Sequence, residues 1–325
     1  MTMGGLNPAI SIAENYRVWA SEVRGLSPAY VSLAESVADD RPILRFLTSL
    51  PPPKRQPNLL FAAARYLLGE PAEIGDLRRL ARRDRDALSG VMLERRTQTN
   101  EPARCATLLP ALAQLPEPLA LIEVGASAGL TLLFDRYSYD YAGHRIAGSD
   151  PDAPILHCDP RGPVPLPDRE PDIAWRAGLD LNPLDVTRDD DVRWLTCLLW
   201  PGEGDREQRL AAAVASARRA PGDAPPVYRG DLLTDLPALA AQAPPRATLV
   251  VFHSAVLAYV DPAGRERFAG TVRDLGATWL SNEAPGVVPG LPGKFQSGTF
   301  MLARDGRTPL ARTDGHGNWV QWLAA

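Results

Sequence analysis

The stretch LALIEVGASAGLTLLFDRY, residues 119–137, decides between two architectures. An apolar run of strand length ends at Gly125, small residues continue to Gly129, and a second apolar run follows at helical spacing. A strand, a glycine-rich turn and a helix in this order fit the nucleophile elbow Gly-x-Ser-x-Gly of a serine hydrolase. They also fit the first cofactor-binding loop of a Rossmann-like fold, in which backbone N–H groups and a helix N-terminus meet the ligand.

The first third of the chain carries helical patterns and no alternating strand pattern. Ser11 and Ser27 stand where helix caps are expected, and a helix is expected to end at Gly69. A charged helix is expected from about residue 75 to 95. We therefore predict an all-helical N-terminal domain over residues 1–115, which acts as a lid or a substrate domain.

The pattern changes after Pro118, where apolar runs of strand length begin to alternate with helical segments. The five runs are residues 119–125, 172–180, 226–231, 247–254 and 277–283. Strands that alternate with helices favour a parallel sheet covered on both faces. We expect the segment 130–137 to be the first of these helices.

Two last apolar runs, residues 298–306 and 318–325, have only a turn-rich segment between them and are expected to pair as an antiparallel edge. The segment 139–171 is rich in Pro, Asp and Gly and is expected to be an insertion with a hairpin that involves ILHCD. The predicted fold class is α/β. It has a Rossmann-like, mostly parallel sheet with helices on both faces and an antiparallel C-terminal edge, and an all-helical region precedes it. The cofactor-binding domain is expected to span residues 116–325.

Composition limits the classes of function. The chain has 325 residues, 45% hydrophobic and 23% charged, and a formal net charge of −4, which is ordinary for a soluble protein and argues against nucleic acid as a partner. The three cysteines form no Cys-x-x-Cys motif, so no metal site is expected. No signal peptide and no run of 18 apolar residues occurs, so we expect a cytoplasmic protein without membrane association.

The hydrolase interpretation needs more than Ser127. His316 or His253 could serve as its late histidine, but the region before Ser127 offers no strand to shape an oxyanion hole. The carboxylate of Glu123 would also oppose a developing oxyanion beside the nucleophile. The hydrolase stays an alternative.

The cofactor interpretation explains more residues. Glu123, Gly125, Ser127 and Gly129 have the spacing acid-x-Gly-x-Gly-x-Gly, with Ser in place of the middle glycine. This is the first motif of Rossmann-like S-adenosylmethionine methyltransferases. Gly125 allows the turn, Gly129 allows close packing, and Glu123 is expected to face the charged amino-acid end of the cofactor.

Acids at the ends of later strands agree with this interpretation. Asp180 ends the second run and is expected to accept hydrogen bonds from the ribose hydroxyls, and Asp231 ends the third and is expected to face the adenine amino group. Asp180 comes later than the usual spacing of about 20 residues, so Asp150 and Asp159 are alternative ribose acids. His253 ends the fourth run and is the candidate general base, with a buried, structurally satisfied histidine as the alternative.

The sequence resembles a bacterial family, domain of unknown function 2332, over nearly its whole length. The resemblance is carried by Asn100–Arg104, LIEVGASAGLTLLFDRYSYDY, WRAGLDLNPLDV, DDVRWLTCLLWPG, VVFHSAVLAYV, WLSNEAPG and the closing His316–Trp319. It implies family membership, whereas the affinity to methyltransferases is an analogy at the level of the fold.

Three acid or basic residues complete the candidate site. Glu101 and Arg104 lie just before the first strand, and Glu283 ends the fifth. We expect the helical region to close over the cofactor site and contribute Glu101 and Arg104, and Glu101 or Glu283 to orient the substrate. The alternative for Asn100–Arg104 is a helix cap with Pro102 in the first turn. The sequence thus favours an S-adenosylmethionine-dependent methyltransferase that acts on an unknown small-molecule or protein acceptor. A protein that binds S-adenosylmethionine for regulation or other chemistry, and a hydrolase that uses Ser127, are the alternatives.

Overall fold

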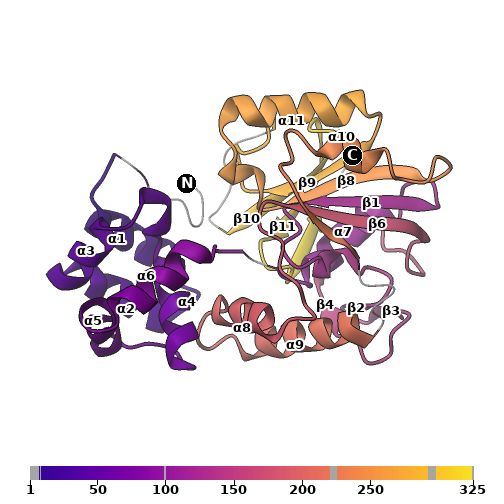
Figure 1. The fold of residues 1–325 in the computed structure, drawn as a ribbon. Helices are drawn as coiled ribbons and strands as arrows, with labels where there is room; N and C mark the ends of the chain where they lie inside the picture. Colours follow the sequence, from indigo (N-terminus) through magenta and orange to yellow (C-terminus); the bar gives the residue numbers. More distant parts are fainter. Residues whose placement is uncertain (1–6, 8, 99, 220–224, 292–297, 324–325) are drawn as a thin grey trace. The chain divides into compact units, whose positions relative to one another are not determined.

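The computed structural model describes residues 7, 9–98, 100–219, 225–291 and 298–323. The chain divides into two compact units (Figure 1). The first comprises Met1–Thr99 and Arg188–Gln208, and the second comprises Asn100–Thr187 and Arg209–Ala325. The helix that directly precedes the first strand therefore belongs to the second unit, and two later helical segments contribute to the first.

The first unit is helical, as the sequence predicts. Its elements are α1 (Ile12–Glu22), α2 (Pro28–Ala38), α3 (Arg41–Thr48), the 3-10 turn η1 (Pro52–Lys54), α4 (Pro57–Leu68), α5 (Ile74–Arg82), α6 (Arg85–Glu94), α8 (Asp189–Cys197) and the start of α9 (Gly204–Arg219). The Ser11 hydroxyl accepts the Glu14 backbone N–H at 3.2 Å and caps α1. Ser27 precedes α2 but makes no such bond, and Gly69 ends α4 with φ of 85°.

The single charged helix expected over residues 75–95 is wrong. The chain forms α5 and α6, which are separated at Arg83 and Asp84. Leu77 and Leu80 on α5 and Leu88 and Met92 on α6 are buried. The break lets both short helices pack on α4, which contacts each of them.

The second unit holds a nine-stranded sheet in the order β5-β12-β11-β10-β9-β8-β1-β6-β7. Its strands are β1 (Leu119–Val124), β5 (Asp159–Arg161), β6 (Ile173–Asp180), β7 (Val227–Arg229), β8 (Thr248–Ser254), β9 (Thr278–Glu283), β10 (Thr299–Arg304), β11 (Thr308–Asp314) and β12 (Trp319–Trp322). β7, β6, β1, β8 and β9 are parallel, and β9–β12 form antiparallel pairs. The α/β fold class with an antiparallel C-terminal edge is confirmed.

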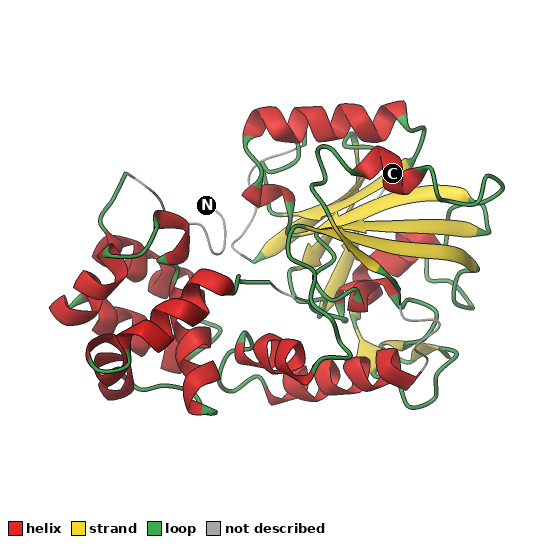
Figure 2. Ribbon diagram, viewed as in Figure 1, coloured by secondary structure: helices red, strands yellow, loops and turns green. Residues whose placement is uncertain are grey.

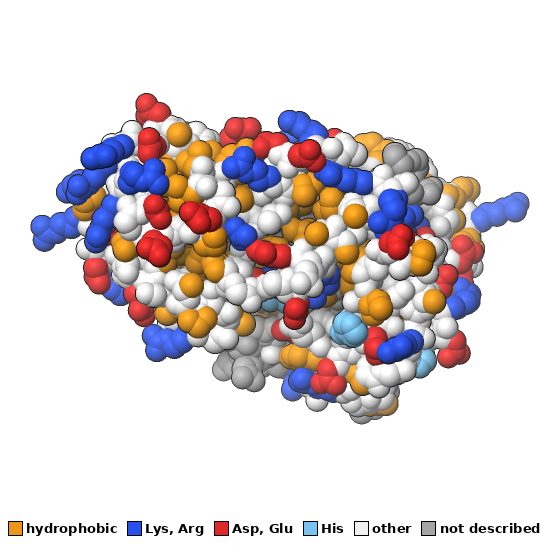
Figure 3. Space-filling model, turned by 90° about the horizontal axis from the view of Figure 1, so that it is seen from below, with side chains coloured by type: hydrophobic (Ala, Val, Ile, Leu, Met, Phe, Trp, Pro, Cys, Tyr) orange, Lys and Arg blue, Asp and Glu red, His pale blue; other side chains and the backbone are white. Residues whose placement is uncertain are grey.

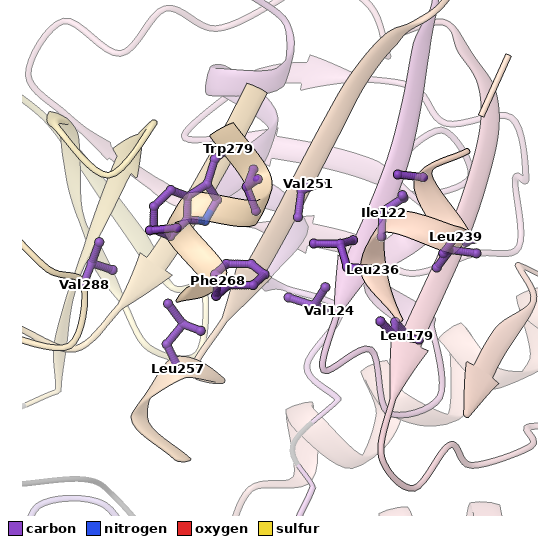
Figure 4. Packing of buried hydrophobic residues seen from close by; sticks show 14 of the residues in the cluster. Ile122, Val124, Leu179, Leu236, Leu239, Val251, Leu257, Phe268, Trp279 and Val288 are labelled. Carbon is purple, nitrogen blue, oxygen red and sulfur yellow. The ribbon is translucent and has the colours of Figure 1, made fainter. Parts of the chain in front are cut away.

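Helices lie on both sides of this sheet (Figure 2). They are α7 (Arg104–Leu112), α10 (Leu236–Ala240), α11 (Pro262–Asp274) and the 3-10 turns η2 (Leu130–Leu132) and η3 (Leu257–Tyr259). The face under α10 and α11 carries an apolar core in which Val124, Val251, Phe268 and Trp279 are buried together (Figure 4). No helix within the described residues combines the length and the apolar character that a membrane span requires.

The C-terminal edge is built differently from the predicted pair. β10 and β12 do not pair with each other, because the segment between them contains β11, which pairs with both. Asp305 and Gly306 adopt positive φ values of 56° and 62°. These two residues make the tight turn that returns the chain from β10 into β11.

The helix expected over residues 130–137 is also wrong. Only the short turn η2 forms, and the chain then enters β2 (Ser138–Tyr141). The Leu130 carbonyl accepts the buried Tyr137 hydroxyl at 2.7 Å, and the Leu132 carbonyl accepts the Arg176 guanidinium at 3.0 Å. One side chain of the segment itself and one from β6 thus take carbonyls that a helix would have used.

The inserted segment forms a small sheet of its own in the order β3-β2-β4, with β3 at His144–Ile146 and β4 at Ile155–His157. The hairpin joins β2 and β3, and β4 lies parallel to β2. The ILHCD segment therefore supplies a parallel strand, so the hairpin expected for it is wrong. β5 then joins the main sheet beside β12.

Candidate functional site

The strand order creates one topological switch point. From β1 the chain proceeds to β6 and β7 on one side and then crosses to β8 on the other. In open α/β sheets, ligands bind outside the carboxyl ends of the strands at such a point. The carboxyl ends of β1, β6, β7 and β8 therefore define the candidate site.

The loop that follows β1 is held by the protein itself. Gly125, Ser127 and Gly129 have φ values of 71°, 53° and 72°. The Ser127 N–H donates to Asp180 Oδ2 at 2.8 Å, and Asn100 bonds both the Ala126 carbonyl and the Leu130 N–H at 3.0 Å. A non-glycine residue in the left-handed region is strained, and such residues gather at functional sites.

Gly125 is required for packing as well as for its dihedral angle. A Cβ added there would lie 2.4 Å from Val256 Cγ2, in the loop that leaves β8. A Cβ added at Gly317 would lie 2.3 Å from the backbone oxygen of Ala103. A side chain can yield to such a contact, whereas backbone cannot.

This difference gives a prediction. Gly125→Ala is expected to lower the free energy of unfolding by about 1–3 kcal/mol, because it combines a clash with an unfavourable φ. Adding Val256→Ala to Gly125→Ala should recover part of that loss, measured by denaturant unfolding in a double-mutant cycle. Adding the same Val256→Ala change to Gly317→Ala should recover nothing. If the effects of Val256→Ala and Gly125→Ala simply added, as those of Val256→Ala and Gly317→Ala should, the contact between position 125 and Val256 would be contradicted.

Glu123 lies at the end of β1 with its side chain buried. One carboxylate oxygen, Oε1, accepts the Thr131 hydroxyl, and the other, Oε2, is buried without a hydrogen-bond partner. Burial raises the pKa of Glu123 to about 8, the Asp180 charge adds to the rise, and the Thr131 bond and the Arg104 charge oppose it. The Glu123 carboxyl group therefore keeps one buried oxygen without a hydrogen-bond partner at the carboxyl end of β1.

Arg104 and Glu101 stand at the start of α7 and are both buried. Arg104 donates to the Ser254 carbonyl at the end of β8 and to the Gly315 carbonyl in the turn before β12, each at 3.0 Å. Glu101 pairs with Arg209 at 2.8 Å and accepts the Ala103 N–H. The structure thus brings Arg104 close to the β1 and β8 ends and gives Glu101 a structural ion pair.

Asp180 is the last residue of β6, as predicted, and Asp231 lies two residues beyond the end of β7. Asp180 Oδ1 accepts the Asn182 N–H at 2.7 Å, while Oδ2 accepts Ser127, so this carboxylate links two loops. Asp231 accepts the Leu233 N–H at 2.9 Å in a tight turn. Beside them, Leu181 is 57% exposed, an apolar surface at the strand end that sequence reasoning missed. Its signal was an apolar residue directly after a strand-ending acid.

The two alternative ribose acids lie elsewhere. Asp150 accepts hydrogen bonds from Arg136, Ser216 and Arg219, which hold its pKa well below the usual range despite burial. Asp159 is on β5, at the far edge of the sheet from β7. Neither is at the carboxyl end of β1, so Asp180 is the acid that the structure places there.

His253 and Glu283 form a buried pair on the other face of the sheet. Glu123 is level with Phe252 in the β1–β8 register, and side chains alternate along a strand, so His253 points to the α11 side. His253 Nδ1 lies 2.7 Å from Glu283 Oε1, and Trp279 Nε1 donates to His253 Nε2 at 2.9 Å. Both imidazole nitrogens are engaged, which favours the alternative of a structurally satisfied histidine.

Glu283 positions the loop after β8. The same oxygen that meets His253 also accepts the backbone N–H groups of Val256 and Leu257, at 2.7 and 2.9 Å. That loop packs Val256 over Gly125 and ends at Tyr259, whose side chain is exposed. Glu283 therefore acts on the site through the loop that it holds.

The Ser127 hydroxyl lacks the partner that a nucleophile needs. It is buried, and its Oγ has no hydrogen-bond partner among the described residues. Both nitrogens of His253 are occupied on the opposite face, as described above. The geometry therefore weighs against the serine hydrolase. The described residues also contain no group of three side chains that could hold a metal ion.

Both basic and acidic side chains occur on the face drawn in Figure 3. A nucleic-acid surface typically shows basic residues gathered on one face. The expectation of a small-molecule partner stays a prediction.

The fold and the switch-point site define an α/β protein with a doubly covered, mostly parallel sheet. The family model described as an uncharacterised protein conserved in bacteria (DUF2332) matches residues 13–322. The chain belongs to that family. Comparison with curated proteins gave no match, and neither did comparison with solved structures.

Proposed function

We propose that the protein binds S-adenosylmethionine at the carboxyl ends of β1, β6 and β7 and is a methyltransferase-like enzyme. The observation that carries this proposal is the buried, partnerless Oε2 of Glu123 at the switch point. Buried polar atoms nearly always have partners, so an orphaned one at a ligand-binding edge calls for a donor or a cation from outside. S-adenosylmethionine carries an ammonium and a sulfonium group.

The neighbouring residues fit the rest of this ligand. Asp180 Oδ2 accepts the Ser127 N–H and Oδ1 accepts the Asn182 N–H, and these bonds hold the carboxylate at the carboxyl ends of β1 and β6, where we expect it to accept the ribose hydroxyls. Leu181 offers an exposed apolar surface for a planar ring. Tyr259 offers another beside the β8 end. When bound, the ligand supplies a methyl group for in-line transfer, and the protein positions the acceptor.

Calorimetric titration of ligand-stripped protein tests this function. S-adenosylmethionine is expected to bind with a micromolar dissociation constant. Asp180→Ala should weaken binding at least tenfold, because two loops lose their shared carboxylate. The control Asp159→Ala, on an exposed edge strand, should bind as the wild type does. Absence of binding to the wild-type protein would refute the proposal.

A second candidate is a protein that binds S-adenosylmethionine without transferring its methyl group. The engagement of both His253 nitrogens favours it, because this candidate base then has no free nitrogen. Incubation with methyl-labelled S-adenosylmethionine and panels of small-molecule and protein acceptors separates the two. Label transfer that depends on Asp180 supports the enzyme, whereas tight binding with no transfer supports the second candidate.

A further inference from the structure

The buried carboxyl group of Glu123 can be either protonated or ionised. Its Oε1 is bonded to Thr131, while Oε2 faces no donor and is shielded from water. An isolated buried carboxylate is costly, so the group either keeps a proton or meets a positive charge. The strand order places this carboxyl group at the edge of the sheet where a ligand is expected to bind.

The charged and titratable neighbours of Glu123 act on its protonation state in opposite directions, so a bound ligand can change that state. From α7, the Arg104 guanidinium favours the ionised form of Glu123, and from β6 the Asp180 carboxylate opposes it. Cys105 on α7 and Tyr137 after η2 also feel Glu123, but burial raises the pKa of each well above its usual value, so both are neutral near pH 7. Among these neighbours, Arg104 is the cation that lowers the pKa of Glu123 against the effect of burial. Its guanidinium also donates to two carbonyls.

We propose that Glu123 receives a cationic group of the ligand on Oε2 and releases one proton to solvent as that group binds. This inference rests on the function proposed above. The exchange balances: the Oε2–H bond breaks, its proton goes to the buffer, and the carboxylate that remains pairs with the ligand's positive charge. The pKa of about 8 means that Glu123 holds this proton at neutral pH. The ligand class is therefore a cation, and a neutral analogue would not displace the proton.

Calorimetry in buffers of different ionisation enthalpy measures this proton. S-adenosylmethionine is titrated into wild-type protein between pH 6.0 and 7.2, below the usual pKa of an α-amino group, about 7.7–8.0. The slope of the observed enthalpy against the buffer enthalpy is expected to show release of close to one proton. The association constant should rise about tenfold per pH unit over this range. The Glu123→Gln variant should bind more weakly, release no proton and lose the pH dependence.

The control is Glu266→Gln, the same change at an exposed position on α11. It should match the wild type in both affinity and proton release. Wild-type binding with no proton release would overturn this inference and leave the proposed function standing. Failure of S-adenosylmethionine to bind at any pH would overturn the function itself. If Glu123→Gln does not bind, the wild-type proton count and pH dependence decide alone.

Discussion

Raising the pH from 5 to 8 is expected to destabilise the wild-type protein, and Glu123→Gln is expected to remove most of that loss. In the folded protein the pKa of Glu123 is about 8, against an ordinary value of 4.5. Between these values the folded state holds a proton that the unfolded state has lost, so the free energy of unfolding falls as pH rises. Below pH 4.5 both states hold the proton, so this loss of stability is absent. Above pH 8 both states have released it, so the loss is complete.

The size of this effect follows from linkage. One proton contributes a slope of about 1.4 kcal/mol per pH unit in the steep part of the range. Denaturant unfolding at pH 5, 6, 7 and 8 measures it as the difference between the wild-type and Glu123→Gln profiles. The variant should be similar to the wild type at pH 5 and more stable at pH 8. Parallel profiles for the two proteins would show that Glu123 is ionised in the folded state throughout.

Replacing His253 by alanine is expected to cost about 2–5 kcal/mol of stability, the second large effect. The change removes a donor from Glu283 and an acceptor from Trp279, and it leaves a cavity beside Phe268. Denaturant unfolding measures the loss.

The control for this prediction is His157→Ala on β4, where the histidine side chain is 75% exposed. That change should stay within about 0.5 kcal/mol of the wild type. A His253→Ala variant with wild-type stability that abolishes turnover would restore the general-base role and contradict the structural one.

The sheet could be predicted from the sequence because its central strands are long apolar runs bounded by glycine and proline. The runs that give β1, β8 and β9 match the structure within a residue or two. The failures lie where distant side chains replace local hydrogen bonds. The sequence near residues 130–137 does not indicate that Arg176 donates to the Leu132 carbonyl, so the helical spacing there predicts a helix that does not form.

The sequence predicts part of the candidate site. Strand-ending acids led to Glu123 and Asp180, which the topology brings together with Arg104. The sequence predicts His253 and Glu283 in the same cluster, but strand alternation places their side chains on the opposite face of the sheet. Val251 and His253 share a face because they are two residues apart, and Val251 belongs to the apolar core under α11. The alternation of side chains along β1 and β8 therefore separates Glu123 from His253 even at the level of the sequence.

A crystal structure of the protein with S-adenosylmethionine tests the central claim most directly. We predict a positively charged group of the ligand within ion-pair distance of Glu123 Oε2 and the ribose hydroxyls beside Asp180. A ligand bound away from the carboxyl ends of β1 and β6, or one whose charged groups leave Glu123 Oε2 without a partner, would contradict the account.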